Sequence, residues 1–255
     1  MISPLAYVDA SAKLGANVTV HPFAYIDKNV EIGDDCEIMP HVSIMSGTRM
    51  GKRNRIFNGA VIAAEPQDFN YKGDDTIVEI GDDNVIRENV VINRATNSDG
   101  KTVIGNGNFL HEGVHVSHDT HIGNHSVFGY GSKISGNCMI EDYVIFGGNV
   151  LVSQGCRVGT WSMTQTGCRF RKDVPPYIVA ALEPTTYYGV NSVILMHEGM
   201  SEKIVKHISH AYRIIYQGNT SIFDAFLMIK DQVPMSDEIQ HIIDFISASK
   251  LGIIK

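Results

Sequence analysis

The chain has 255 residues, of which 44% are hydrophobic, enough to form a sizeable core. Its 21 basic and 28 acidic side chains give a net charge of −7, which argues against general nucleic-acid binding. No apolar run approaches the roughly 18 residues that a membrane span needs. The N-terminus lacks the charged and apolar regions of a secretory signal, so we expect a cytoplasmic protein.

Large apolar residues recur at every sixth position through most of the first two thirds of the chain. The pattern holds in three runs: Ile2 to Ile62, Ile80 to Ile92, and Ile104 to Val158. Neither an α-helix nor a flat strand has a period of six, whereas a coil of repeated short strands does. Three hexapeptides form one turn of a triangular prism. The sequence therefore predicts an all-β solenoid, a parallel β-helix, over residues 1–185.

A small or slim residue follows four positions after each large one, two positions before the next. Residues two apart in a strand share a face, so both are expected to point inward. All four cysteines occupy this small slot: Cys36, Cys138, Cys156 and Cys168. We interpret them as core residues in a reducing compartment, not as a disulfide or zinc framework.

Two stretches interrupt the repeat without losing its phase, residues 63–78 and 93–103. Each is rich in polar or glycine residues and reads as a loop leaving the coil. Loops of this length in a regular solenoid are usually functional, although an insertion without a function is the alternative.

The repeat fades near residue 170, and residues 186–255 are expected to form a small helical domain. Ser201 would cap a helix over 202–217 that Gly218 ends. A second helix is expected over 220–232, and Ser236 would cap a third.

Five histidines fall within fifteen residues: His111, His115, His118, His121 and His125. None takes an inward slot, so each can face solvent or a partner subunit. His111, His121 and His125 are interpreted as part of a polar outer face. Zinc held by His115, His118 and His121 is an alternative, but the turn of the prism aims these rings in different directions.

The sharper hypothesis is general-base catalysis by His118, because imidazole titrates near neutral pH and Asp119 can orient the ring. Residues three hexapeptides apart stack on neighbouring coils, about 4.8 Å apart. Gly136 therefore lies above His118, Asn137 above Asp119, and Gln154 above Gly136. A glycine there leaves a backbone N–H open for an oxyanion, although a simple turn glycine explains it equally well.

Over its whole length the chain resembles the acyl-[acyl-carrier-protein]–UDP-N-acetylglucosamine O-acyltransferase family of lipid A synthesis. The resemblance rests on six stretches: Pro66-Gln67-Asp68, Glu79 to Glu88, Glu112 to Asp119, Asp173 to Tyr177, Gly189-Val190-Asn191 and Ala211 to Tyr216. It implies a left-handed β-helix, an exception to the right-handed rule for parallel crossovers.

The resemblance also implies roles for individual residues. His118 would deprotonate the glucosamine 3-hydroxyl, Asp119 would polarise His118, and the Gly136 amide would hold the oxyanion. Substrate would contact Gln67, Asp68, His115, Asn137, Gln154 and Asn191, and Thr166 lies where the family sets acyl length.

Further expectations from the family concern partners. The site would lie between subunits of a homotrimer, with no cofactor or metal. The donor would be a hydroxyacyl thioester on acyl carrier protein, an acidic partner. Its candidate docking residues are Arg169, Arg171, Lys172, Lys203 and Lys206. The alternative is that these are ordinary charged residues of a solvated rim.

The chain departs from the family pattern at several positions. Asn70 stands where a lysine is common, and Asn137 and Ser153 stand where histidines are frequent. His197 and Glu198 replace an arginine pair that would bind the nucleotide phosphates. Two alternatives therefore stay open: an acyltransferase acting on another nucleotide sugar, and a non-catalytic hexapeptide scaffold, against which His118, Asp119 and Gly136 speak.

Overall fold

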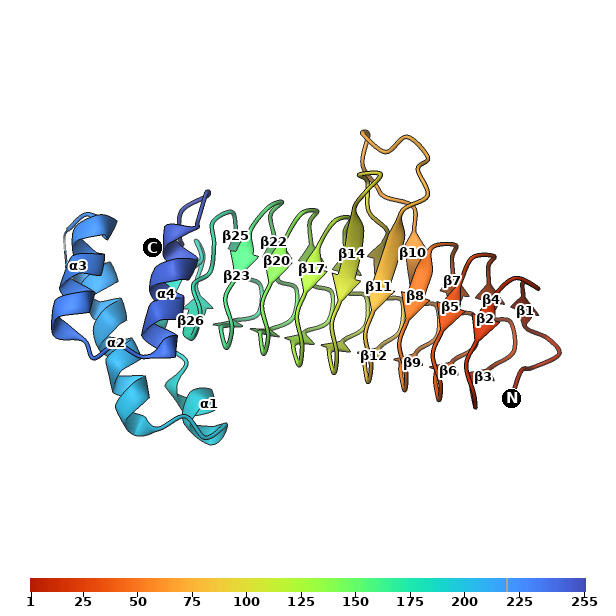
Figure 1. Cartoon of the computed structure of the whole chain (residues 1–255), viewed down its shortest axis with the longest axis horizontal. Coiled ribbons are helices and arrows are strands. Elements are labelled where there is room, and N and C mark those ends of the chain that lie inside the picture. Colours follow the sequence, from red (N-terminus) through yellow and green to blue (C-terminus); the bar gives the residue numbers. More distant parts are fainter. Residues whose placement is uncertain (219) are drawn as a thin grey trace.

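The computed structural model describes residues 1–218 and 220–255. Most of the chain winds into a long left-handed parallel β-helix, with helices gathered at its C-terminal end (Figure 1). Its strands are mostly two residues long and lie in three sheets, one for each side of the prism.

The nine-stranded sheet contains β1 (Tyr7–Val8), β4 (Tyr25–Ile26), β7 (Ser43–Ile44), β10 (Val61–Ala64), β13 (Val91–Asn93), β16 (His115–Val116), β19 (Lys133–Ile134), β22 (Leu151–Val152) and β25 (Arg169–Phe170). The eight-stranded sheet contains β2 (Lys13–Leu14), β5 (Glu31–Ile32), β8 (Thr48–Met50), β11 (Ile77–Ile80), β14 (Lys101–Ile104), β17 (His121–Ile122), β20 (Met139–Ile140) and β23 (Arg157–Val158). The ten-stranded sheet contains β3 (Thr19–Val20), β6 (Glu37–Ile38), β9 (Arg55–Ile56), β12 (Val85–Ile86), β15 (Phe109–Leu110), β18 (Val127–Phe128), β21 (Ile145–Phe146), β24 (Met163–Thr164), β26 (Ile178–Ala181) and β27 (Thr186–Val190).

The predicted register is confirmed along the regular coils. His115 pairs with Lys133 and Val116 with Ile134, so each residue pairs with the one three hexapeptides further along the chain. In each short strand the second residue points inward and the first outward, and the inward isoleucines and the small residues between them form one continuous core. All four cysteines are buried and free, as their inward position predicted.

Both polar insertions leave the prism at the same corner, the one that joins the nine-stranded to the eight-stranded sheet. They project side by side from the coils of β10 and β13 (Figure 1). Both loops are shorter than the pattern indicated. In the first, Ala63 and Ala64 belong to β10, and Ile77 and Val78 belong to β11. The first loop is 65–76, and the second, between β13 and β14, is 94–100.

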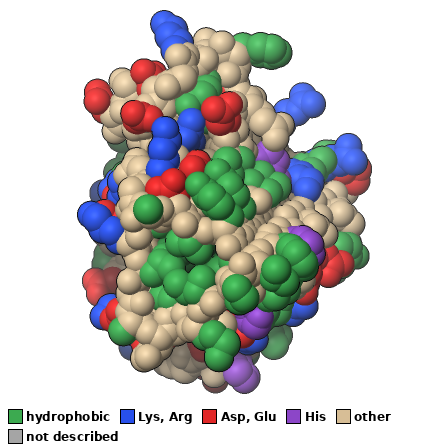
Figure 2. Space-filling view, turned by 90° about the vertical axis from the view of Figure 1, so that its right-hand side faces the viewer, with side chains coloured by type: hydrophobic (Ala, Val, Ile, Leu, Met, Phe, Trp, Pro, Cys, Tyr) green, Lys and Arg blue, Asp and Glu red, His purple; other side chains and the backbone are tan. Residues whose placement is uncertain are grey.

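The N-terminal end of the prism is not covered by another element. Figure 2 views the molecule from this end and shows apolar side chains gathered on it. Met1, Ile2 and Leu5 of the first coil are all well exposed.

The C-terminal part begins with a hairpin that the sequence did not predict. β26 continues the ten-stranded sheet beside β24, and β27 pairs with it antiparallel. The four helices are α1 (Ser192–His197), α2 (Glu202–Gln217), α3 (Ile222–Gln232) and α4 (Asp237–Ser247). Ser201, Ser221 and Ser236 accept hydrogen bonds from the first turns of α2, α3 and α4, as expected of serine N-caps.

We propose a division into two parts, the coil and the helical end, at residues 185 and 186. This boundary falls between the two strands of the hairpin, so one side of the β-helix runs directly into the helical end. Arg157 of β23 joins the two parts by donating to the main-chain oxygen of Phe245 in α4, at 3.0 Å.

Candidate active site

His118 lies at the corner from which the two loops project, between β16 and β17. Its Nδ1 lies 2.8 Å from Oδ2 of Asp119, its neighbour in the chain. Asp119 has a left-handed backbone, with φ of 56°, a conformation that aspartate tolerates better than most residues. Since a carboxylate only accepts, Nδ1 carries the proton and Nε2 is the basic nitrogen of the neutral ring.

The carboxylate of Asp119 is held from the coil below by the second loop. Its Oδ2 accepts the main-chain N–H of Thr96 at 2.9 Å, and its Oδ1 accepts Nδ2 of Asn97 at 3.3 Å. The Asp119 N–H donates to Oγ1 of Thr102 at 3.0 Å. Asp119 therefore has a fixed direction, and so does the imidazole that it holds.

A second carboxylate faces the other side of the imidazole. Oδ2 of Asp68, from the first loop, lies 3.5 Å from Nε2 of His118. The N–H of Asn70 donates to Asp68 and is the main cause that lowers the pKa of Asp68 below its usual value. Nε2 therefore points into a space that is bordered by an anion.

The expected openness of His118 is wrong, because only 6% of the residue is exposed. The first loop covers the ring on one side and the coil above closes the other. A methyl group built on Gly136 would lie 2.5 Å from both Cε1 and Nε2 of His118. The stacking predicted from the hexapeptide spacing is thus present in the structure.

The neighbours of Gly136 stack as the spacing indicated. The N–H of Asn137 donates to the main-chain oxygen of His118, and the N–H of Gly155, next to Gln154, donates to that of Gly136. Asn137 and Gln154 both have exposed side chains. Within the described residues the Gly136 N–H donates no hydrogen bond.

His115 lies on the outer face of β16, and its Nε2 is 2.6 Å from Oδ1 of Asn93. Asn93 donates its amide hydrogens to the main-chain oxygens of Ala64 and Glu65, where β10 meets the first loop, so its oxygen must face the ring. His115 consequently donates from Nε2. Burial, helped by the charge of Lys133, lowers its pKa, which favours the neutral ring.

The other histidines lie outside this arrangement. His111 packs against Phe109, His125 stacks on Tyr143, and His121 points outward from the eight-stranded sheet. Among residues 1–218 and 220–255, no three His, Cys, Asp or Glu side chains gather as a metal site would require.

The structure does not bring all of the expected site residues together in one chain. Gln67 is exposed beside Asp68, and Thr166 is exposed at the corner between β24 and β25. Asn191 is buried at the start of α1, where its Nδ2 donates to the main-chain oxygen of Trp161 at 3.0 Å. Neither Thr166 nor Asn191 lies at the corner that carries His118.

The positions that depart from the family pattern have partners of their own. Asn70 donates from Nδ2 to Oδ1 of Asp68 at 3.0 Å. His197 and Glu198 form an exposed pair at 2.9 Å at the end of α1. The candidate docking cations are all exposed, and Lys206 pairs with Glu202 along α2.

Sequence reasoning missed the residues that support the site from below: Asn93, Arg94, Thr96, Asn97 and Thr102. The sequence carries one signal for these residues, the length of the second loop. The second loop lengthens its coil by one hexapeptide, so the neighbour below lies four hexapeptides back, as in the pairing of Ile92 with Val116. Counting back by this longer interval leads from His115 to Val91 and from His118 to Arg94, and thus to the start of the second loop.

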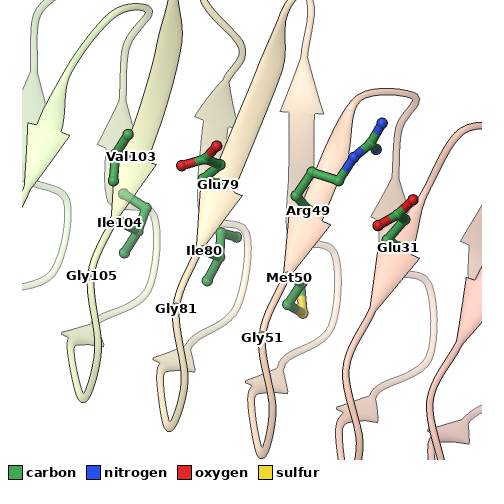
Figure 3. Close-up of a pocket in the computed structure, with 10 residues that line it drawn as sticks. All are labelled: Glu31, Arg49, Met50, Gly51, Glu79, Ile80, Gly81, Val103, Ile104 and Gly105. Atoms are coloured by element: carbon green, nitrogen blue, oxygen red, sulfur yellow. The ribbon is translucent and has the colours of Figure 1, made fainter.

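Other hollows lie away from this site. A shallow groove of about 420 Å³ crosses the outer face of the eight-stranded sheet, with Glu31, Arg49 and Glu79 along one edge and three glycines along the other (Figure 3). A cavity of about 670 Å³ lies among α2, α4 and the C-terminal residues, lined by Tyr187, Tyr216 and Lys172 among others.

Comparisons with known proteins agree with this arrangement. The family model described as "Udp N-acetylglucosamine O-acyltransferase; Domain 2" matches residues 173–254, and that of the bacterial transferase hexapeptide matches residues 101–136. The chain is 41% identical to the acyl-[acyl-carrier-protein]–UDP-N-acetylglucosamine O-acyltransferase of Xanthomonas axonopodis pv. citri, covering 100% of this chain and 98% of that protein.

Solved structures agree equally well. The UDP-N-acetylglucosamine acyltransferase of Bacteroides fragilis is 51% identical, with a TM-score of 0.99 and 100% of both chains covered. The corresponding structure from Acinetobacter baumannii is 33% identical, with a TM-score of 0.97, covering 100% of this chain and 99% of that one.

A hexapeptide-repeat β-helix with a helical C-terminal end and a histidine held at a corner defines the class of hexapeptide acyltransferases. Within that class, the full-length matches identify the particular family. The chain belongs to the acyl-[acyl-carrier-protein]–UDP-N-acetylglucosamine O-acyltransferases.

Proposed function

We propose that this chain transfers a (R)-3-hydroxyacyl group from acyl carrier protein to the 3-hydroxyl of UDP-N-acetylglucosamine, the first step of lipid A biosynthesis. Membership of the family supports the substrates. The observation that carries the chemistry is the position of His118, whose Nδ1 is held by Asp119 and whose Nε2 faces a space bordered by Asp68 and Gly136.

The first step is removal of the sugar proton. Nε2 of His118 takes the proton of the 3-hydroxyl while that oxygen attacks the thioester carbonyl carbon. The ring becomes an imidazolium whose charge is balanced by Asp119 at Nδ1 and Asp68 near Nε2. Neutral Nε2 has a lone pair directed at this space, which suits it to act as the base.

The second step is collapse of the tetrahedral intermediate. The carbonyl oxygen becomes an oxyanion, and the Gly136 N–H, which donates to no described residue, supports it. When the carbonyl re-forms, the carbon–sulfur bond breaks, and His118 returns its proton to the leaving thiolate. The products are the O-acylated sugar nucleotide and the free thiol of the carrier.

Substrate contacts are proposed for polar side chains of the two loops and the neighbouring coils. Asp68 and Gln67 on the first loop, with the neutral His115, suit the sugar hydroxyl and amide groups. Asn137 and Gln154, on the coils above, suit the more distant parts of the substrates. Asn191 can offer its amide oxygen and one amide hydrogen, since its Nδ2 donates a single hydrogen bond to the main-chain oxygen of Trp161. Thr166 is proposed to limit the length of the acyl chain.

A homotrimer with a site between subunits is part of the proposal. The outward row of the ten-stranded sheet is apolar over consecutive coils: Val85, Phe109, Val127, Ile145 and Met163. The outward row of the eight-stranded sheet is instead charged at Glu31, Arg49 and Glu79. An apolar prism face of this length supports burial against another copy of the chain.

Acyl carrier protein is proposed to dock near the exposed cations Arg169, Arg171, Lys172, Lys203 and Lys206. Four buried free cysteines support a reducing compartment, and we place the activity in the cytoplasm. None of the described helices is long and apolar enough to cross a membrane.

The test is a transfer assay with purified protein, hydroxyacyl carrier protein and UDP-N-acetylglucosamine, read as labelled O-acyl product. The proposal expects product with this sugar nucleotide and none when it is omitted. Product formed only with an amino-sugar nucleotide would instead establish the alternative acceptor. If no nucleotide sugar is acylated, the result would favour the alternative that the chain is a non-catalytic hexapeptide scaffold.

A further inference from the structure

Thr96 lies in the second loop, on the coil directly below His118. Its main-chain N–H donates to Oδ2 of Asp119 at 2.9 Å, the oxygen that also holds Nδ1 of His118. The residue is only 6% exposed, yet its Oγ1 has no hydrogen-bond partner among the described residues. A buried hydroxyl without a partner is costly, and such groups are often retained for function.

Asp68 lies on the other side of the imidazole, with its Oδ2 3.5 Å from Nε2 of His118. The hydroxyl of Thr96 contributes to the lowered pKa of Asp68, after the larger effect of the Asn70 N–H. The geometry nevertheless falls short of a hydrogen bond to that carboxylate. One residue thus approaches both carboxylates that flank the imidazole, Asp119 through its amide and Asp68 through its hydroxyl.

The main chain on both sides of Thr96 is fixed. The hydroxyl of Thr76 donates to the main-chain oxygen of Ala95, and a guanidinium nitrogen of Arg94 donates to the hydroxyl of Tyr71. Gly100 passes so close to Asp119 that a methyl group there would lie 2.5 Å from Oδ1. Thr76 and Tyr71 belong to the first loop, so these contacts tie the two loops to each other, while Asp119 anchors the second loop to the coil above.

The first loop is less enclosed at its tip. Phe69, next to Asp68, is fully exposed, whereas Asp68 itself is largely covered. Thr96, in the adjacent second loop, offers a hydroxyl donor without a partner among the described residues.

We propose that Thr96 is a positioning residue for the acyl transfer, whose hydroxyl donates to Asp68 when the sugar is bound while its amide holds Asp119. The proposal rests on the transferase function proposed above. Thr96 keeps the two anions on opposite sides of His118, one that orients the base and one that binds the sugar hydroxyl beside it.

The experiment compares Thr96→Val with Thr96→Ser in steady-state transfer to UDP-N-acetylglucosamine. Valine keeps the shape and the amide but removes the hydroxyl, and serine keeps both polar groups. We expect Thr96→Val to lower kcat/KM about tenfold or more, and Thr96→Ser to stay within about threefold of the wild type. Thr96→Ala, which also lacks the hydroxyl, gives the same comparison if valine does not fit.

The matched control is Thr164→Val. Thr164 is also a buried threonine whose Oγ1 has no partner among the described residues, but it lies inside the prism on β24. This control should keep the activity of the wild type. A merely structural effect of removing such a hydroxyl would appear in both variants.

A double-mutant cycle tests whether Thr96 acts through Asp68. In the Asp68→Asn background, Thr96→Val should cause little further loss of kcat/KM. The proposal is overturned if Thr96→Val keeps activity within twofold, or if its full effect persists in that background. A wild-type protein that fails to acylate the sugar nucleotide would instead contradict the proposed function.

Discussion

The imidazole of His118 lies against the α-carbon of Gly136 on the next coil, with no room for a side chain between them. An added methyl group would lie 2.5 Å from Cε1 and Nε2, well inside van der Waals contact. The same glycine carries the N–H proposed for the oxyanion. In the proposed mechanism, one small residue therefore makes room for the base and supports the developing charge.

Gly136→Ala should consequently remove activity without unfolding the coil. The methyl group would push the ring from Asp119 or from Asp68, and a displacement of this size can cost a hundredfold in rate. The measurement is kcat with saturating substrates, alongside thermal unfolding. Ser135→Ala, one residue earlier, adds no atom near the ring and should behave as the wild type. Full activity in Gly136→Ala would mean that the ring does not work from this position.

His118→Ala tests the base directly. Loss of a general base typically lowers the rate by about 10²–10⁴, and the substrates should still bind. The value of kcat would be measured with UDP-N-acetylglucosamine and the acylated carrier. His121→Ala is the matched control, since that ring points outward from the neighbouring strand. Equal losses in both variants would argue against a specific role for His118.

The sequence pattern was sufficient for the parallel β-helix and for the part of the site on the coil above His118. A period of six indicates a coil of short strands, although its left hand came from the family resemblance, and the spacing of three hexapeptides per turn places Gly136 on His118 and Asn137 on Asp119. Ser201 and Ser236 marked the starts of α2 and α4, because an N-cap is a local interaction between neighbours in the chain.

The part of the site on the coil below His118 could not be derived from the hexapeptide spacing. Thr96 and Asn97 reach Asp119 through a loop whose path depends on tertiary contacts, such as that of Arg94 with Tyr71. The hairpin of β26 and β27 was missed because it continues the sheet without the repeat. Asn191 has a hydrogen bond to Trp161, far back in the chain, which no local pattern signals.

His115 should make stability depend on pH. Burial lowers its pKa in the folded chain, so below about 6.5 the unfolded chain binds more protons than the folded one. The free energy of unfolding then falls as the pH falls, by at most about 1.4 kcal/mol per pH unit from this group. His115→Gln keeps a donor for Asn93 and removes the titration. In urea unfolding between pH 5.5 and 8, the free energy of unfolding of the wild type should fall relative to that of the variant as the pH falls. If the two free energies change in parallel with pH, the lowered pKa of His115 is contradicted.

The apolar row of the ten-stranded sheet predicts which face joins the subunits. Ile145 points outward from β21, between Val127 and Met163 on the adjacent strands. Ile145→Asp would bury a charge against another subunit, so the proposed trimer should dissociate and its activity should fall. Met139→Asp is the matched control, because Met139 is exposed on the eight-stranded sheet in register with His121. Light scattering should give three times the chain mass of 28.1 kDa for the wild type and for Met139→Asp, and the single-chain mass for Ile145→Asp. A trimer that survives Ile145→Asp and dissociates with Met139→Asp would place the interface on the charged face instead.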